Sequence, residues 1–185
     1  AADLIADAKK RPGELTYASS GIGGVPHLAA ALFSNEAGIE TRHIPFGAGS
    51  QAVADIINGQ VTFLFYPYSA LGGQIQDGVL RVLANSAPKR TSTVPDVPTV
   101  AELGFPDATI QSWQGVYAPS GTPPEIIEKL SKAVNQAVGD PAMVAKGENM
   151  GLEFGGNSAE ELAAFTASEI ERFKKILAIA GIEAK

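Results

Sequence analysis

Hydrophobic and polar positions along the first two thirds of the chain follow the pattern of an α/β fold. Short apolar runs that end in small or turn-forming residues predict strands, and longer segments with one apolar face predict helices. The predicted strands are residues 15–18, 42–46, 61–66, 80–84 and 109–118. Helices are predicted at residues 2–10, 25–37, 50–58 and 68–77, the last one interrupted by a Gly-Gly pair. Strands that alternate with helices indicate βαβ units.

The last third of the chain carries mainly helix-start signals. Capping-box spacings, a Ser or Thr followed three residues later by Glu, occur at residues 99–102, 122–125 and 158–161. A further helix is predicted to begin at Asp140-Pro141. The change from strand-rich to helix-rich sequence places the candidate domain boundary near Gln114-Gly115. The strand predicted at residues 61–66 is apolar throughout its core and is expected to be covered on both faces.

Composition narrows the functional classes. The 185 residues are 45% hydrophobic and 18% charged, which is typical of a globular protein. The net charge of −6 disfavours nucleic acid as a partner, although a local site can still attract an anion. Without cysteine, the chain has no disulfide, thiolate metal site or Cys nucleophile. The histidine and carboxylate spacings predict no metal site, and we expect no cofactor.

The strongest local feature is a glycine-rich turn between a predicted strand and a predicted helix, at residues 19–24. Helix N-terminal amides are unpaired and carry partial positive charge, and glycine lets an anion approach them closely. The turn therefore indicates either a carboxylate or phosphate site or a plain strand-to-helix connection with capping serines. His27 follows one helical turn later, where a packing role is more common than a catalytic one.

Nucleotide and hydrolase motifs are absent from this turn. A dinucleotide fingerprint needs Gly where the chain has Pro26, and no Gly-Lys-Ser/Thr of a P-loop occurs. The nucleophile elbow G-x-S-x-G fails because Ala18 stands at its first Gly. His43, at the start of a predicted strand, is expected to be structural.

Two further loops follow predicted strands. Pro45, Phe46, Gly47 and Ala48 lead into one helix, and Tyr66 follows the apolar strand. In parallel α/β sheets ligands bind beyond the carboxyl ends of the strands. All three loops are therefore expected to face one cleft.

Five segments, in the same order, resemble the Bug-type receptors of tripartite tricarboxylate transporters. The chain reads SSGIGGVPHLA from Ser19, where that family has S-S-G-x-G-S-x-x-H-L-A. From His43 it reads HIPFGAGSQAVADIINGQVT, similar to H-V-P-Y-K-G followed by D-L-L-x-G-Q-V-D. The stretches 78–104, 113–115 and 118–123 match family segments too. This resemblance covers nearly the whole chain.

The resemblance implies a type II periplasmic-binding-protein fold and a periplasmic receptor. Such a receptor captures a small carboxylate and delivers it to membrane transporter subunits, without catalysis. Residues 1–113 are expected to form the second lobe, with its ligand loop, and residues 114–185 the C-terminal part of the first lobe. The N-terminal part of the first lobe would precede Ala1, so the truncated chain is expected to bind weakly and to self-associate.

The same resemblance supplies the candidate ligand-binding residues and three departures from the family pattern. Gly24 replaces a Ser, Gly47 replaces a Lys, and Tyr66 replaces an acidic residue. An enzyme that holds an anionic substrate on the glycine-rich turn is the alternative. The candidate ligand-binding residues are Ser19, Ser20, Gly21, Gly23, Gly24, His27, Pro45, Phe46, Gly47, Ala48 and Tyr66.

Overall fold

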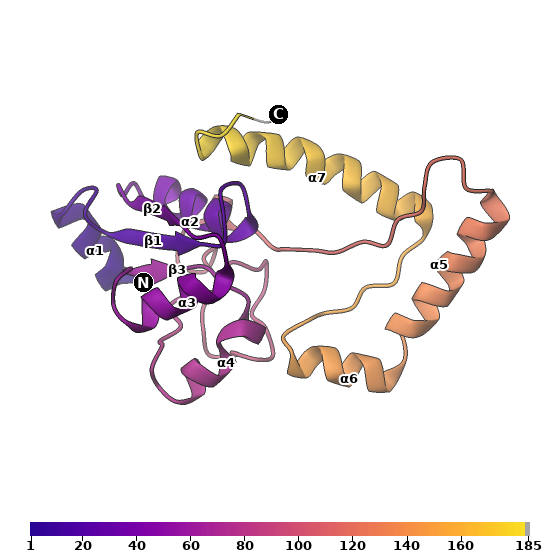
Figure 1. Cartoon of the computed structure of the whole chain (residues 1–185), viewed down its shortest axis with the longest axis horizontal. Helices are drawn as coiled ribbons and strands as arrows, with labels where there is room; N and C mark the ends of the chain where they lie inside the picture. The colour runs from indigo at the N-terminus through magenta and orange to yellow at the C-terminus, as the bar shows by residue number, and fades with distance from the viewer. Residues whose placement is uncertain (184–185) are drawn as a thin grey trace. The chain divides into compact units, whose positions relative to one another are not determined.

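A three-stranded parallel sheet forms the centre of the first part of the chain (Figure 1). The computed structural model describes residues 1–183. β1 (Thr16–Ser19) lies between β2 (Arg42–Pro45) and β3 (Phe63–Leu64), in the order β2-β1-β3. Because all three strands run in the same direction, the loops that follow them lie at one edge of the sheet.

The two faces of the sheet are covered by different helices. Tyr17 of β1 is in register with His43 and Phe63, so these three rings share one face. His27 of α2 (Val25–Glu36) stacks on that face. Ala18 and its register partners Ile44 and Leu64 face the other way, and they pack with Ala52 and Ile56 of α3 (Gly49–Ile57). The sheet therefore has a helix on each face, as βαβ crossovers require.

The predicted helices of this part agree with the structure to within two residues. α1 (Ala2–Lys10), α2 and α3 form where an apolar stripe was expected. Gly38 (φ 59°) and Gly59 (φ 70°) follow α2 and α3 in the left-handed conformation that commonly ends helices. α4 (Tyr68–Gln76) is continuous, so the predicted interruption at Gly72-Gly73 is wrong.

Three predicted strands are shorter than expected or absent among the described residues. Only Phe63 and Leu64 of the 61–66 run pair with β1, so this strand is shorter than predicted. Its two faces are covered as expected, because Phe63 packs on Phe33 of α2 and Leu64 on the cluster that includes Ala52 of α3. Residues 80–84 and 109–118 form no strand. An extended segment becomes a strand only where a neighbouring strand accepts its hydrogen bonds. A 3₁₀ turn, η1 (Pro106–Ala108), precedes residue 109.

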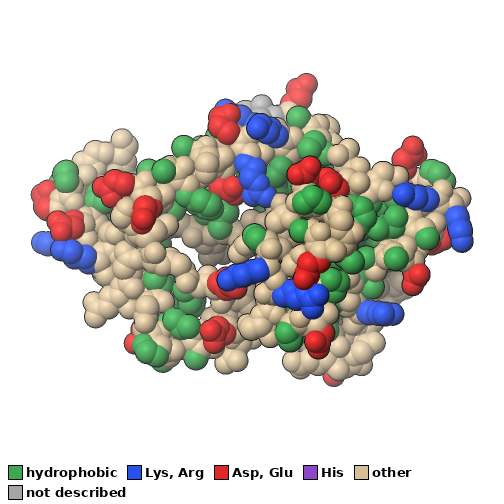
Figure 2. Space-filling model, turned by 180° about the vertical axis from the view of Figure 1, so that it is seen from behind, with side chains coloured by type: hydrophobic (Ala, Val, Ile, Leu, Met, Phe, Trp, Pro, Cys, Tyr) green, Lys and Arg blue, Asp and Glu red, His purple; other side chains and the backbone are tan. Residues whose placement is uncertain are grey.

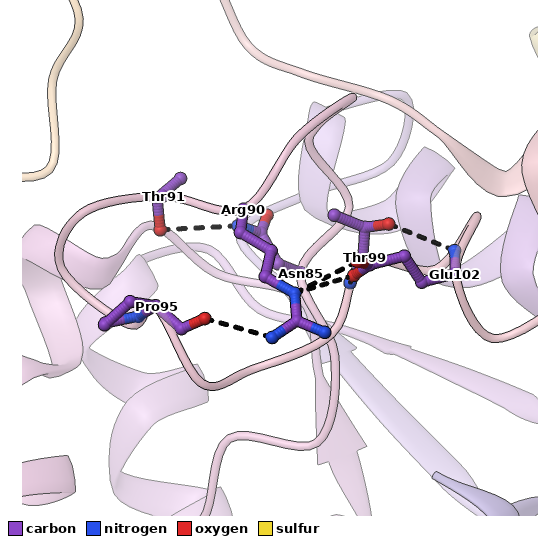
Figure 3. A network of polar contacts seen from close by, with 6 residues as sticks. All are labelled: Asn85, Arg90, Thr91, Pro95, Thr99 and Glu102. Carbon is purple, nitrogen blue, oxygen red and sulfur yellow. Dashed lines mark hydrogen bonds and ion pairs between the residues drawn. The ribbon is translucent and has the colours of Figure 1, made fainter.

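The loop after residue 84 is held by a side-chain network (Figure 3). Glu102 and Thr99 bond reciprocally through backbone N–H groups, at 2.7 and 3.1 Å, as their capping-box spacing predicted. Arg90 Nε donates to both Glu102 oxygens, and its Nη1 donates to the carbonyl of Pro95. A single parallel bridge joins Asn85 to Thr99. This network fixes a segment that has no regular secondary structure.

The second part of the chain is helical. It contains α5 (Pro124–Val138), α6 (Pro141–Asn149) and α7 (Ala159–Ile179). Asp140 caps α6 by accepting two amide hydrogen bonds, and Ser158 and Glu161 form the predicted capping box of α7. The capping box expected at Thr122 is wrong, because the Thr122 hydroxyl donates to the carbonyl of Pro119 instead. Here α5 begins one residue later, after Pro123.

Two compact units divide the chain. One comprises residues 1–112 with the residues from 175 on, and the other comprises residues 113–174. In the second unit α5 buries no side chain although one of its faces is apolar, and Val116, Tyr117 and Leu130 are exposed. Figure 2 shows hydrophobic side chains at the surface among the charged ones. No described helix has the length and apolar character needed to cross a bilayer.

Candidate ligand-binding site

The glycine-rich turn connects β1 to α2 through backbone conformations that favour glycine. Gly21 has φ 136° and Gly23 has φ 81°, both in the region that L-residues with side chains rarely adopt. Gly24 has φ −69° and is the N-cap residue of α2, with no side-chain capping bond. The backbone conformation therefore requires glycine at positions 21 and 23. Gly24 has no side chain that could cap the first amides of α2.

Ser19 organises the beginning of this turn. Its side chain is completely buried, and its hydroxyl accepts a hydrogen bond from Gly21 N–H (3.2 Å) and contacts Gly21 O (2.9 Å). His43 Nε2 lies 2.6 Å from the hydroxyl oxygen of Ser19. A His43 that carries its proton on Nε2 satisfies all three contacts, because Ser19 then accepts from His43 and donates to Gly21 O. Ser20, next to it, is exposed.

His27 holds the other end of the turn. Its Nδ1 accepts a hydrogen bond from Gly23 N–H at 3.1 Å, so the neutral ring carries its proton on Nε2. The ring stacks on His43 with centroids 3.8 Å apart and planes 8° apart, and Tyr17 stacks against both. His27 is 6% exposed and belongs to the core beneath the turn.

Burial keeps both imidazoles neutral. It lowers the pKa of His27, and it lowers the pKa of His43 to about 4, with the charge of His27 as the second cause. Burial also raises the pKa of Tyr17. At pH 7 this stack is therefore uncharged, and each ring has one nitrogen without a proton, which in His27 accepts from Gly23.

The second and third loops meet at the start of α3. Phe46 N–H donates to Ser19 O at 3.0 Å, which ties the second loop to the first. Tyr66 lies with its hydroxyl directly over Gly49, where a Cβ would overlap that oxygen and lie 3.0 Å from Cζ. Gly47 has open space around it. The absence of a side chain at Gly49 therefore lets Tyr66 approach the backbone of α3.

The three helices that follow the strands all begin without a side-chain cap. The N-cap residues of α2, α3 and α4 are Gly24, Ala48 and Pro67. Asp140 and Ser158 cap α6 and α7, whereas α1 and α5 also begin without a side-chain cap. Residues 19–27, 45–50 and 64–68 contain no Lys, Arg, Asp or Glu. This edge of the sheet thus offers helix N-terminal amides and hydroxyls, donors that suit a carboxylate.

Some of the predicted site residues form hydrogen bonds with one another, whereas for others the structure gives only their position and exposure. Hydrogen bonds link Ser19 to Gly21 at the beginning of the first turn and Gly23 to His27 at its end. Pro45 ends β2 and is exposed, as are Gly47 and Ala48, and Phe46 is half-buried. The residue that the sequence interpretation missed is His43, which contacts Ser19 directly. Its signal was the strand alternation of residues 42–45, which puts His43 and Ile44 on opposite faces.

No group of three or more potential metal ligands occurs among the described residues. His27 and His43 are engaged with Gly23, Ser19 and each other, and no acidic residue lies within these three loops. The site therefore suits an anion bound by neutral donors.

Comparison with known proteins identifies the family. Residues 1–182 match the tripartite tricarboxylate transporter family receptor, TctC. The protein BugT of Bordetella pertussis is 34% identical over 182 residues, which make up 98% of this chain and 56% of BugT. The chain thus spans little more than half the length of this curated relative.

Solved structures of receptors of this kind have the same fold as this chain. Rpa4515 of R. palustris, solved with adipate, is 34% identical with a TM-score of 0.88, over 98% of this chain and 60% of that one. The periplasmic binding protein BugD is 27% identical with a TM-score of 0.84, over 100% and 62%. The predicted α/β fold of the periplasmic-binding-protein type is confirmed. The chain belongs to the tripartite tricarboxylate transporter receptor family.

Proposed function

We propose that this chain is the solute-binding part of a periplasmic receptor that captures a small carboxylate for a tripartite tricarboxylate-type transporter. The observation that carries the proposal is the shared edge of β1, β2 and β3, where three helices begin without side-chain caps. Amides at helix starts bind carboxylates without a charged side chain. Membership of a receptor family supports the same function.

The proposed ligand contacts are the hydroxyl of Ser20 and those amides of the first turn that do not bond within it, with the second loop and Tyr66 beside them. The amides of Gly21 and Gly23 already donate to Ser19 and His27. Ser20 is exposed and free to turn its hydroxyl to a solute, whereas the hydroxyl of Ser19 is engaged in holding Gly21. Ser19 thus supports the site chiefly through the geometry of the turn. Adipate is the first solute to test, because it accompanies Rpa4515 in its structure.

The domain organisation follows as part of the proposal. Residues 1–113 would form one lobe of the receptor and residues 114–185 the returning part of the other. Relatives are longer than this chain, segments 80–84 and 109–118 form no strand, and α5 leaves its apolar face exposed. A further segment of the receptor would cover these surfaces, and in its absence exposed apolar side chains favour self-association.

The contact between Ser19 and His43 favours an enzyme as the second candidate. A serine hydroxyl 2.6 Å from an imidazole is the geometry of an activated nucleophile. However, Ser19 is completely buried and its oxygen already bonds both polar backbone groups of Gly21. A substrate cannot reach that oxygen without opening the turn, so we propose a receptor without catalytic turnover.

Titration calorimetry with adipate and related dicarboxylates, on the longest receptor that contains this chain, tests the proposal. Gly23→Val places a β-branched side chain at φ 81° and is expected to abolish binding. Gly13→Val, at φ 73° and outside the three loops, is the control for backbone strain and is expected to retain binding. Mass spectrometry of the recovered solute should show it unaltered. Equal affinity of the wild type and Gly23→Val would contradict the proposed site, and conversion lost in Ser19→Ala would favour the enzyme.

A further inference from the structure

The connection between His27 and Gly23 makes the shape of the first turn depend on a single lone pair. Gly23 precedes α2 and donates its N–H to Nδ1 of His27 in the first turn of the same helix. This bond pairs an amide that precedes α2, and it leaves the first amides of the helix without a side-chain cap. It also holds Gly23 at φ 81°, next to the amides proposed to bind the solute. A ring nitrogen can accept this bond only while it carries no proton.

The stacked rings leave His27 little freedom to find another arrangement. His43 lies against it at 3.8 Å with nearly parallel planes, and Tyr17 contacts both rings. The ring is 6% exposed. Rotation that would turn Nδ1 away from Gly23 therefore has to displace His43, which is itself bonded to Ser19.

We propose that His27 is a positioning residue that shapes the glycine-rich turn through Gly23, and that protonation of Nδ1 releases the turn and weakens solute binding. The inference rests on the function proposed above and assigns His27 a role without direct contact with the solute. A protonated Nδ1 would place its N–H against the Gly23 N–H, two donors facing each other.

The groups that surround His27 indicate that protonation of its Nδ1 controls the hydrogen bond to Gly23. The titratable neighbours on the same sheet face are Tyr17 from β1 and His43 from β2, and β3 contributes Phe63. Arg42 of β2 is exposed and points to the opposite face, and Asp107 of η1, which packs against α2, is exposed. Burial lowers the pKa of His27, and it lowers the pKa of His43 to about 4. The bond to Gly23 is therefore intact at neutral pH and is lost on acidification.

The test combines NMR with calorimetry and two matched variants. His27→Asn keeps an acceptor oxygen close to the place of Nδ1 and does not titrate, and His27→Phe keeps a stacked ring and has no acceptor. The amide resonances of Gly21 and Gly23 are followed from pH 7.5 to pH 4, with the imidazole nitrogens recorded in parallel. Adipate affinity is measured at pH 7.5 and pH 4.5 on the same proteins.

In the wild type, the chemical shift of the Gly23 amide should change with the titration of His27. Adipate affinity should fall about two- to tenfold, which corresponds to the loss of one hydrogen bond. In His27→Asn the Gly23 amide should not titrate, and any remaining fall in affinity measures the protonation of adipate itself. At pH 7.5, His27→Phe should already show the Gly23 amide resonance and the adipate affinity of the acid form of the wild type. A Gly23 amide that stays unchanged while His27 titrates overturns the inference. If the amide titrates but adipate binds at no pH, the role of His27 in the turn stands and the proposed solute is wrong.

Discussion

Replacing Gly49 by alanine is expected to displace Tyr66 and weaken solute binding, whereas alanine at Gly47 in the same loop should leave Tyr66 in place. At Gly49 a methyl group would overlap the Tyr66 hydroxyl oxygen and lie 3.0 Å from Cζ, and at Gly47 no atom lies within 4 Å. Overpacking costs about 1–3 kcal/mol. Alanine regains up to ~1 kcal/mol at a helical position, and Gly49 is the first residue of α3.

The net loss of folding free energy for Gly49→Ala should therefore be roughly 0–2 kcal/mol, because Tyr66 is only half-buried and can move. Urea unfolding measures this free energy, and calorimetry with adipate measures the effect on the site. In the Tyr66→Phe background the overlapping oxygen is gone, so the cost of alanine should shrink, with a coupling energy of about 1 kcal/mol. Equal effects of Gly49→Ala with Tyr and with Phe at position 66, or equal effects at Gly47 and Gly49, would refute the reasoning.

Three other predictions concern the first turn, α7 and acid stability. Gly23→Ala should lower the free energy of unfolding by about 1–2 kcal/mol because alanine is strained at φ 81°, whereas Gly24→Ala should cost less; urea unfolding compares them. Ser158→Ala removes the cap of α7 and should cost about 0.5–2 kcal/mol, with Ser158→Asp nearly neutral in the same assay. The lowered pKa of His43, about 4, means that the unfolded chain binds its proton first, so stability is full above pH 6.5 and falls toward pH 4. His43→Gln should reduce this slope by less than about 1.4 kcal/mol per pH unit, since the ring is partly solvated.

Local signals in the sequence were sufficient to predict the helices and the loops that form the candidate site. Glycines at helix ends, such as Gly38 and Gly59, act through their own backbone conformation. The capping box at Ser158 likewise needs only residues three apart. Thr122 has the same spacing, but its hydroxyl bonds to Pro119 O, a local competitor that a spacing rule does not include.

Features that depend on distant partners could not be predicted in the same way. The segments 80–84 and 109–118 have strand-like composition, but pairing decides whether they become strands. The role of His43 depends on its register with Tyr17, which lies 26 positions earlier in the chain. Its contact with Ser19 follows from that register, so the hydrogen bond beneath the glycine-rich turn was visible only in the folded structure.

The lack of charged side chains in the three loops has a consequence for the kinetics of the solute capture proposed above. At a distance, a solute anion meets the field of a chain with net charge −6, which repels it, and the attracting amides act only at close range. Added salt screens the long-range repulsion over about 8–10 Å and leaves hydrogen bonds inside the site almost unchanged. The association rate constant should therefore rise with ionic strength while the dissociation rate stays constant. A receptor that binds its anion through lysine or arginine would show the reverse, with association slowed by salt.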